Sequence, residues 1–118
     1  MWTRLLERLR QASPTAAQET LRPEVFLHRR RPEDVIIDVR TPAEYQQGHL
    51  EGALNLDLMA ADFHTKIAQL DPSRTYYLYC RSGNRSGQAA RLLRQHGLEA
   101  YNIGGLEDLV RAGAPLAP

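Results

Sequence analysis

The chain has 118 residues, 42% of them hydrophobic and 25% charged, with a formal net charge of +1. This length indicates one domain with its own core, and the near-neutral charge argues against nucleic acid as a partner. Cys80 is the only cysteine, which excludes an internal disulfide and suits a reducing compartment. No apolar stretch reaches membrane-spanning length, and the N-terminus lacks the apolar core of a signal peptide. We therefore expect a cytoplasmic protein with no membrane or nucleic-acid partner.

The N-terminal residues have the pattern of an amphipathic helix. The apolar residues of this segment recur at the spacing of one helical face: Trp2, Leu5, Leu6 and Leu9. The pattern ends at Ser13-Pro14, so we predict an amphipathic helix and a linker over residues 1–19, followed by one domain over residues 20–118. The helix is expected to pack on the domain, and docking onto a partner chain or a membrane surface is the alternative.

Strand-like and helix-like segments alternate along the rest of the chain. Strands are predicted at residues 35–39, 53–56, 75–79 and 99–103, with a candidate fifth strand at Thr20-Leu21. Helices are predicted at residues 23–30, from residue 42 to Gly48, at residues 62–70, after Cys80 and after Gly105. This alternation is typical of an α/β fold, with a central, mostly parallel sheet of four or five strands and helices on both faces.

Local signals mark where some of these helices begin and end. Thr41 precedes a proline and is predicted to be an N-cap, with Glu44 completing a capping box. The helix before Gly97 is expected to end there in a left-handed turn and to direct His96 toward the core. The arginines at positions 29–31 are expected to form the solvated end of the preceding helix rather than an anion site.

Two of the predicted strands end in polar or reactive residues. The apolar runs before Asp38 and before Cys80 suit strands that are covered on both faces, as in a parallel sheet. Ligands of such sheets bind outside the carboxyl ends of the strands. We therefore expect Asp38-Val39-Arg40 and Cys80, which are distant in the sequence, to face one crevice.

Cys80 begins a loop of small and basic residues, Cys80-Arg81-Ser82-Gly83-Asn84-Arg85-Ser86. The thiolate is the nucleophilic form of cysteine, so features that stabilise it bear on function. Arg81 and Arg85 bring positive charge, and the helix start brings its dipole. Gly83 and Asn84 allow the backbone to curl with its amides inward. The loop is therefore expected to cradle an anion above a reactive sulfur.

Other roles for Cys80 fit the sequence less well. If Cys80 were an inert buried cysteine, the presence of two arginines and a Gly-Asn pair beside it would be a coincidence. A metal site is disfavoured because there is one cysteine and the histidines show no ligand spacing: His28, His49, His64 and His96. No local feature favours a protease-like Cys–His pair, which stays open as a minor alternative.

Three segments resemble the rhodanese family in order and spacing from around residue 20 to residue 112. Residues 37–45, Ile-Asp-Val-Arg-Thr-Pro-Ala-Glu-Tyr, resemble the family's Asp-x-Arg strand end and the helix after it. Residues 48–56 resemble its Gly-His-Ile-x-Gly-Ala-x-Asn segment. Residues 80–86, running on to Gly104-Gly105, resemble its active-site loop and the segment after that loop. The resemblance implies a single rhodanese-like domain.

The resemblance also implies a thiosulfate sulfurtransferase. In the family the cysteine attacks the outer sulfur of thiosulfate, sulfite leaves, and the persulfide passes its sulfur to an acceptor such as cyanide or a thiol. Cys80 matches the nucleophile and Asp38 a supporting residue. The matching substrate-binding positions are Arg81, Ser82, Gly83, Asn84, Arg85 and Arg40. The resemblance implies no cofactor or metal.

Two features qualify this resemblance. The family often has tryptophans on the last helix, where this chain has Leu106 and Leu109, so the pocket rim is expected to differ. Certain cell-cycle phosphatases and arsenate reductases share this fold and a cysteine loop, and they are the competing enzyme class. Cysteine phosphatases use Cys-x5-Arg, which would place an arginine at position 86. Ser86 stands there and Arg85 precedes it, which favours a smaller cradle that suits sulfur.

The expected partners are a small-molecule sulfur donor and a small-molecule acceptor. A persulfide relay to a protein acceptor, or a role as an interaction module, is the alternative to turnover of small molecules. We expect a monomer, because the N-terminal apolar face is the only large apolar patch that the sequence indicates.

Overall fold

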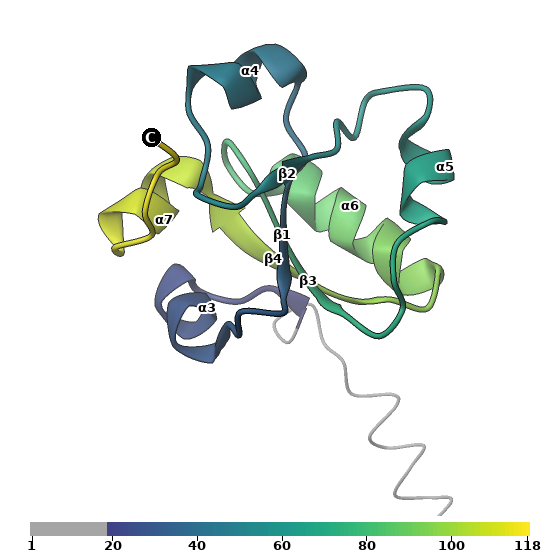
Figure 1. Cartoon of the computed structure of the whole chain (residues 1–118), viewed down its shortest axis with the longest axis horizontal. Helices are drawn as coiled ribbons and strands as arrows, with labels where there is room; N and C mark the ends of the chain where they lie inside the picture. The colour runs from purple at the N-terminus through teal and green to yellow at the C-terminus, as the bar shows by residue number, and fades with distance from the viewer. Residues whose placement is uncertain (1–18) are drawn as a thin grey trace, which may run out of the picture.

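A computed structural model describes residues 19–118, so the predicted N-terminal helix and nearly all of the linker lie outside the described residues. The described part alternates helices and strands as expected (Figure 1). Its elements are α3 (Pro23–Arg29), β1 (Val35–Asp38), α4 (Pro42–Gln47), β2 (Leu54–Asn55), α5 (Phe63–Ile67), β3 (Thr75–Cys80), α6 (Asn84–Gln95), β4 (Glu99–Gly105) and α7 (Leu106–Arg111). None of the helices between residues 19 and 118 has the length and apolar character that a bilayer crossing requires.

Within residues 19–118 the strands form one parallel sheet of four strands in the order β2-β1-β3-β4. The adjacent β1 and β3 pair in register, with Asp38 opposite Tyr79. The candidate fifth strand is reduced to an isolated parallel bridge between Thr20 and Asn102, because the chain turns into α3 directly afterwards. The sheet therefore brings the carboxyl ends of β1 and β3 side by side, as the sequence predicted.

Helices cover both faces of the sheet, and the alternating side chains of the strands form two cores. Ile37 and Leu78 point toward α5 and α6, in a cluster with Phe63, Ala90 and Leu93. On the opposite face lies a second cluster, toward α3 and α7: Phe26, Ile36, Tyr77, Tyr79, Ile103 and Leu109. Figure 1 shows α3 and α7 on one side of the sheet and α6 on the other. The apolar runs of β1 and β3 are thus explained by burial on both faces.

Two local helix signals in the sequence are confirmed, at the start of α4 and at the end of α6. The helix predicted over residues 62–70 is shorter, because the chain continues after Ile67 in turns, with the Leu70 N–H donating to the Ile67 carbonyl. The Thr41 side chain accepts a hydrogen bond from the Glu44 backbone N–H, and the Glu44 carboxylate accepts one from the Thr41 N–H, so the capping box is complete. α6 ends in a Schellman motif in which Gly97 has a φ of +81°, and the Leu98 N–H donates to the Leu93 carbonyl over 3.1 Å.

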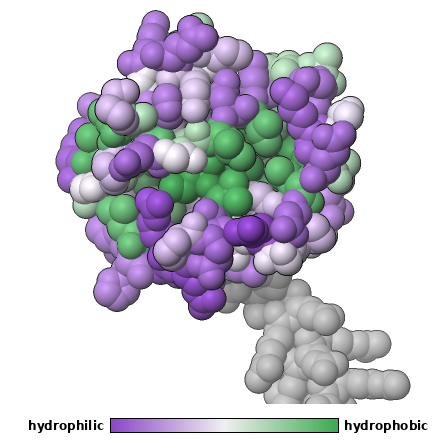
Figure 2. All heavy atoms as spheres, viewed as in Figure 1, coloured by the Kyte–Doolittle hydropathy of each residue, from purple (hydrophilic) through white to green (hydrophobic). Residues whose placement is uncertain are grey.

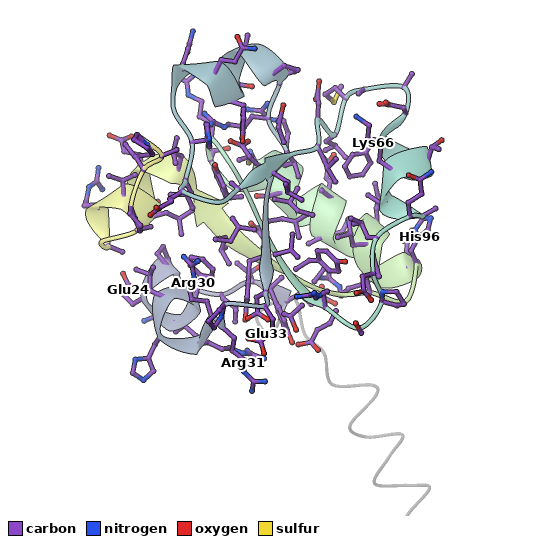
Figure 3. The ribbon with its side chains drawn as sticks, viewed as in Figure 1. Glu24, Arg30, Arg31, Glu33, Lys66 and His96 are labelled. Carbon is purple, nitrogen blue, oxygen red and sulfur yellow. The ribbon has the colours of Figure 1, made fainter. Side chains whose placement is uncertain are left out.

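One orientation predicted from the sequence is wrong. His96 does not face the core: it is exposed at the end of α6, where its ring Nδ1 lies 3.0 Å from the Leu92 carbonyl oxygen (Figure 3). Its position falls after the last helical turn, so the helical spacing that places Leu93 inward no longer applies. The arginines at positions 29–31, at the end of α3, are exposed to solvent as predicted, and Figure 3 labels Arg30 and Arg31.

Candidate functional site

Cys80 is the last residue of β3, and its sulfur lies under the loop that leads into α6. The residue is fully buried, at 0% exposure. The Cys80 Sγ accepts a hydrogen bond from the Gly83 backbone N–H at 3.0 Å and lies 3.4 Å from the Ser86 Oγ. Gly83 adopts a φ of +98°, a left-handed conformation that costs glycine little and that folds the loop back over the sulfur. The predicted curled loop is therefore present.

These contacts control the acidity of the thiol. Burial acts to raise the pKa of Cys80, because the charged thiolate loses water. Hydrogen bonds from the Ser86 side chain and from the backbone of Ser86, Ser82 and Gly83 outweigh that effect, and the pKa is lowered. The sequence led us to expect that the charges of Arg81 and Arg85 would lower the pKa of Cys80, but hydrogen-bond donors in the loop account for most of the lowering.

Ser86 and Asn102 support the loop, and sequence reasoning assigned neither a role. The Ser86 hydroxyl donates to the Asn102 Oδ1 over 2.8 Å, and the Asn102 amide donates to the Gly83 carbonyl over 3.0 Å. Since a hydroxyl carries one proton, Ser86 can donate to Asn102 or to the sulfur at any moment. Ser86 directly follows Arg85 in the predicted loop, but neither its burial nor its β4 partner Asn102 was visible in the sequence.

The start of α7 is pressed against the same loop. A Cβ atom added at Gly105 would collide with the Arg81 carbonyl oxygen, so no larger residue fits there without a shift of the backbone. A glycine at this position therefore lets the backbone of β4 and the backbone of the Cys80 loop come into contact.

Asp38 and Arg40 form a buried ion pair at the end of β1. The Arg40 Nη2 donates to the Asp38 Oδ2 over 2.6 Å, and the side chains of Arg40 and Asp38 are 7% and 0% exposed, respectively. The same Nη2 donates to the Gly48 carbonyl over 2.6 Å, so Arg40 also fixes the end of α4. The Asn55 amide donates to the carbonyls of Asp38 and Arg40. Asp38 and Arg40 make no hydrogen bond to Cys80 within residues 19–118.

Arg85 is occupied by a carboxylate from another element. Its Nη1 and Nη2 donate to the two Glu44 carboxylate oxygens over 2.7 and 3.0 Å. The hydrogen bond from Arg85, with those from Thr41, lowers the pKa of Glu44 from 4.5 to about 2. Glu44 is therefore ionised at neutral pH and offsets much of the positive charge of Arg85.

A groove of about 740 Å³ lies between α4 and α7, beside the Cys80 loop. Arg40 and Arg81 line it near the loop, and Leu106 and Val110 line it on α7. Leu106 thus belongs to the rim of this groove, as anticipated. Leu109, on the same helix, is fully buried in the core and does not line the groove.

The structure gathers the predicted site residues at the edge of the sheet where β1 and β3 end. Arg81 and Asn84 are exposed along the loop, Ser82 lies between Arg81 and Gly83, and Gly83 lies over the sulfur. Arg85 points to α4, and the Asp38–Arg40 pair supports the adjoining strand end. No group of His, Cys, Asp and Glu side chains between residues 19 and 118 is placed to hold a metal ion.

Several similar proteins carry sulfurtransferase names. The chain is 40% identical to thiosulfate sulfurtransferase PspE of Escherichia coli over 74 residues, which are 62% of this chain and 71% of that protein. It is 38% identical to a sulfurtransferase of Allochromatium vinosum over 71% of this chain and 79% of that one. A tRNA sulfurtransferase of Thermoplasma volcanium is 36% identical over 66% of this chain, but only 15% of that longer protein is matched.

Solved structures show the same fold. A rhodanese from E. coli determined with anions has 36% sequence identity and a TM-score of 0.60, over 71% of this chain and 96% of that one. The rhodanese-like domain of an Anabaena protein has 27% identity and a TM-score of 0.70, over 86% of this chain and 80% of that one. The family model for the rhodanese-like domain matches residues 23–112, and the chain therefore belongs to the rhodanese family.

Proposed function

We propose that the protein is a thiosulfate sulfurtransferase in which Cys80 carries the transferred sulfur as a persulfide. The observation that supports this most directly is the buried Cys80 Sγ beneath the Gly83 N–H and the Ser86 hydroxyl, with its pKa lowered. A thiol in this setting is a better nucleophile at neutral pH, because more of it is thiolate. Membership of the rhodanese family and the name of the E. coli relative support the same reaction.

The proposed reaction has two displacement steps. The Cys80 thiolate attacks the outer sulfur of thiosulfate, the sulfur–sulfur bond of thiosulfate breaks, and sulfite leaves with the bonding electrons. The Cys80 persulfide then gives its outer sulfur to cyanide or to a thiol, and the Cys80 thiolate returns. No external oxidant or reductant is needed, and the chain's own residues supply nucleophile and anion binding.

The loop residues have distinct roles in this proposal. Backbone amides of Arg81 to Arg85 hold the outer sulfur of the persulfide, and the Gly83 N–H already lies 3.0 Å from the Cys80 Sγ. Arg81 is exposed and has no ion-pair partner among residues 19–118, so we assign it the larger share in attracting the anionic donor. The charge of Arg85 is partly offset by Glu44, and the Asp38–Arg40 pair supports the strand end.

Phosphate chemistry is disfavoured on the same grounds. A cysteine phosphatase needs a guanidinium that grips the phosphate oxygens, and Ser86 stands at the required position. The neighbouring Arg85 holds Glu44 with both terminal nitrogens. We therefore propose sulfur transfer rather than phosphate chemistry. We also propose that the protein is cytoplasmic and monomeric. In this proposal residues 20–118 form the domain, and residues 1–19 form an amphipathic helix and a linker.

Intact-mass spectrometry before and after addition of thiosulfate tests this proposal. The wild-type protein should gain one sulfur atom, Cys80→Ser should gain none, and thiosulfate–cyanide turnover should be lost in Cys80→Ser. Urea unfolding of the variant checks that its fold is retained. An unchanged mass in the wild type, or equal sulfur uptake by Cys80→Ser, would refute the proposal.

The contribution of Arg85 is tested with a matched variant on the same helix. Arg85→Ala should weaken the use of thiosulfate more than it weakens folding, whereas Arg91→Ala, also on α6 and exposed, should leave turnover unchanged. Equal kinetics in Arg85→Ala and wild type would remove the electrostatic role that we assign to Arg85.

A further inference from the structure

We propose that the groove between α4 and α7 is the docking site of the sulfur acceptor, and that this acceptor is an extended cysteine-bearing segment of another protein with an acidic residue beside the thiol and an apolar residue further along. This proposal rests on the proposed function, because it assumes a Cys80 persulfide. It adds the class of acceptor and the surface that selects it.

The size of the groove argues for an extended occupant. Its volume of about 740 Å³ is within the range of sites that bury molecules far larger than thiosulfate or cyanide. Arg81, directly after Cys80, contacts Gly105 at the start of α7, and from there the groove follows α7 to Val110 and is also lined by Leu116. A thiol of a few atoms at the Cys80 end would leave the far end unused.

The far end of the groove is apolar and open to solvent. Val110 is 38% exposed and Leu116 is 48% exposed, and Leu106, the first residue of α7, also lines the groove. Figure 2 shows hydrophobic surface beside α7, bordered by hydrophilic side chains. Covering these side chains with an apolar residue of the acceptor would remove apolar area from water and stabilise the complex.

The charges in the groove point to an acidic residue near the acceptor thiol. Arg40 is paired with Asp38, and Glu44 with Arg85. Arg111 is within reach of two carboxylates on its own helix. Arg81 is left without a carboxylate partner within the part of the chain that the structure describes, so the end next to Cys80 has surplus positive charge.

The walls of the groove are held in place before an acceptor arrives. α7 is anchored by the buried Leu109 and by the contact of Gly105 with the Arg81 backbone. The C-terminal tail is tied to the segment after α4, because the Glu51 N–H donates to the Pro115 carbonyl and the Ala117 N–H donates to the His49 carbonyl. A preformed groove costs little entropy to order on binding, which favours a short peptide segment.

The transfer step balances without any further reactant. The acceptor thiolate attacks the outer sulfur of the Cys80 persulfide, Cys80–S–SH. The bond between the Cys80 Sγ and the outer sulfur breaks, and its electrons stay on Cys80 as a thiolate. The outer sulfur, with its proton, becomes the terminal atom of the acceptor persulfide.

Three peptide thiols test the proposal on the full-length protein loaded with sulfur from thiosulfate. The apolar probe is acetyl-Leu-Ala-Leu-Glu-Cys-amide, the polar probe has serine in place of both leucines, and the third has lysine in place of glutamate. Single-turnover transfer is followed by the loss of one sulfur from the protein mass. The apolar probe should react roughly tenfold faster than the polar probe, as expected for burial of one or two apolar side chains. The lysine probe should be the slowest, because it faces Arg81.

Variants locate the effect in the groove. Val110→Asp and, separately, Leu116→Asp should bring the ratio of the apolar to the polar rate close to one. Val25→Asp is the matched control, since Val25 is 44% exposed on α3 and does not line the groove, and it should keep the wild-type ratio.

The outcomes separate the two proposals. If no persulfide forms on wild type, the proposed function fails. If a persulfide forms and reacts equally with all three peptides, or if Val25→Asp changes the ratio as much as Val110→Asp does, the docking proposal fails while the proposed function stands. Sedimentation of the wild type at the concentrations used checks a third outcome: a second copy of this chain seated in the groove would also overturn the proposal.

Discussion

The end of β1 and the end of β3 lie next to each other in the sheet but are stabilised differently. At β1, Asp38 and Arg40 neutralise each other out of contact with water. At β3, the Cys80 sulfur is held by a backbone N–H and lies within reach of a hydroxyl, and neither donor carries a full charge. A buried charge that is neutralised by its counter-ion holds the backbone in place, but it attracts a charged ligand only weakly. A buried sulfur that is held by neutral donors is stabilised as a thiolate and still keeps its nucleophilicity.

Glu44 and Arg85 connect these two regions. Glu44 belongs to the helix after β1, and Arg85 belongs to the first turn after the Cys80 loop. The side chains of Glu44 and Arg85 are 27% and 28% exposed, so this pair is intermediate between the buried Asp38–Arg40 pair and the exposed pairs of Arg111. The comparison predicts a graded series of effects on stability.

Removing the buried carboxylate should have the largest effect. Asp38→Ala leaves the Arg40 guanidinium buried without a counter-ion, and we expect the free energy of unfolding to fall by about 3–5 kcal/mol. Urea unfolding measures this loss, and Asp38→Asn, which keeps an acceptor oxygen, should lose less. A loss under about 1 kcal/mol in Asp38→Ala would mean that the pair does not fix the end of β1.

Breaking the connecting pair should have a smaller and pH-dependent effect. Because the pKa of Glu44 in the folded protein is about 2 and its ordinary value is 4.5, the pair stabilises the fold fully above pH 4.5 and loses this contribution as the pH falls toward 2. We expect Glu44→Gln to be less stable than wild type by roughly 2 kcal/mol at pH 6, between the values for exposed and buried pairs.

Urea unfolding of wild type and Glu44→Gln at several pH values measures the difference between them. The difference should shrink between pH 4.5 and pH 2. A difference that is constant over this range would show that Glu44 acts through its shape or through capping, and not through its charge.

Removing the hydroxyl beside the sulfur should change reactivity more than stability. Ser86→Ala deletes the largest contribution that lowers the pKa of Cys80, so the pKa should rise. The rate of alkylation by iodoacetamide, measured against pH, should then have its midpoint at a higher pH than in wild type. The free energy of unfolding should fall by only about 1 kcal/mol for the lost hydrogen bond. An unmoved midpoint would assign the acidity of the thiol to the backbone amides alone.

The exposed pairs of Arg111 should contribute least. Its side chain is 71% exposed and lies 3.5 Å from Glu107 and 3.3 Å from Asp108. Arg111→Ala should change the free energy of unfolding by less than about 0.5 kcal/mol, because water and salt screen such contacts. A loss as large as that of Glu44→Gln would break the proposed relation between burial and stability.

The local features of this molecule were predictable from the sequence, and the long-range contacts were not. The capping box at Thr41, the left-handed Gly97 and the position of Cys80 at a strand end each depend on a few consecutive residues. The interactions that stabilise such patterns involve only neighbouring residues, so the patterns can be recognised without a structure.

The contacts that complete the site depend on which elements lie side by side. The pairing of Arg85 with Glu44 joins residues 41 positions apart, and Ser86 meets Asn102 across the junction of α6 and β4. From the sequence alone, Arg85 is therefore interpreted as a free charge, and Ser86 has no assigned role. His96 was placed inward because the helical period of α6 was extended to the C-cap residue, where the helix has already ended.

The contact between Gly105 and Arg81 has a consequence for how the protein is made. Synthesis proceeds from the N-terminus, and β3 is produced before β4, its neighbour in the sheet. Until residues 102–105 emerge, the nascent chain lacks both the Asn102 amide that holds Gly83 and the strand that supports the loop. The Cys80 loop can therefore reach its folded geometry only after β4 has been synthesised and has joined the sheet.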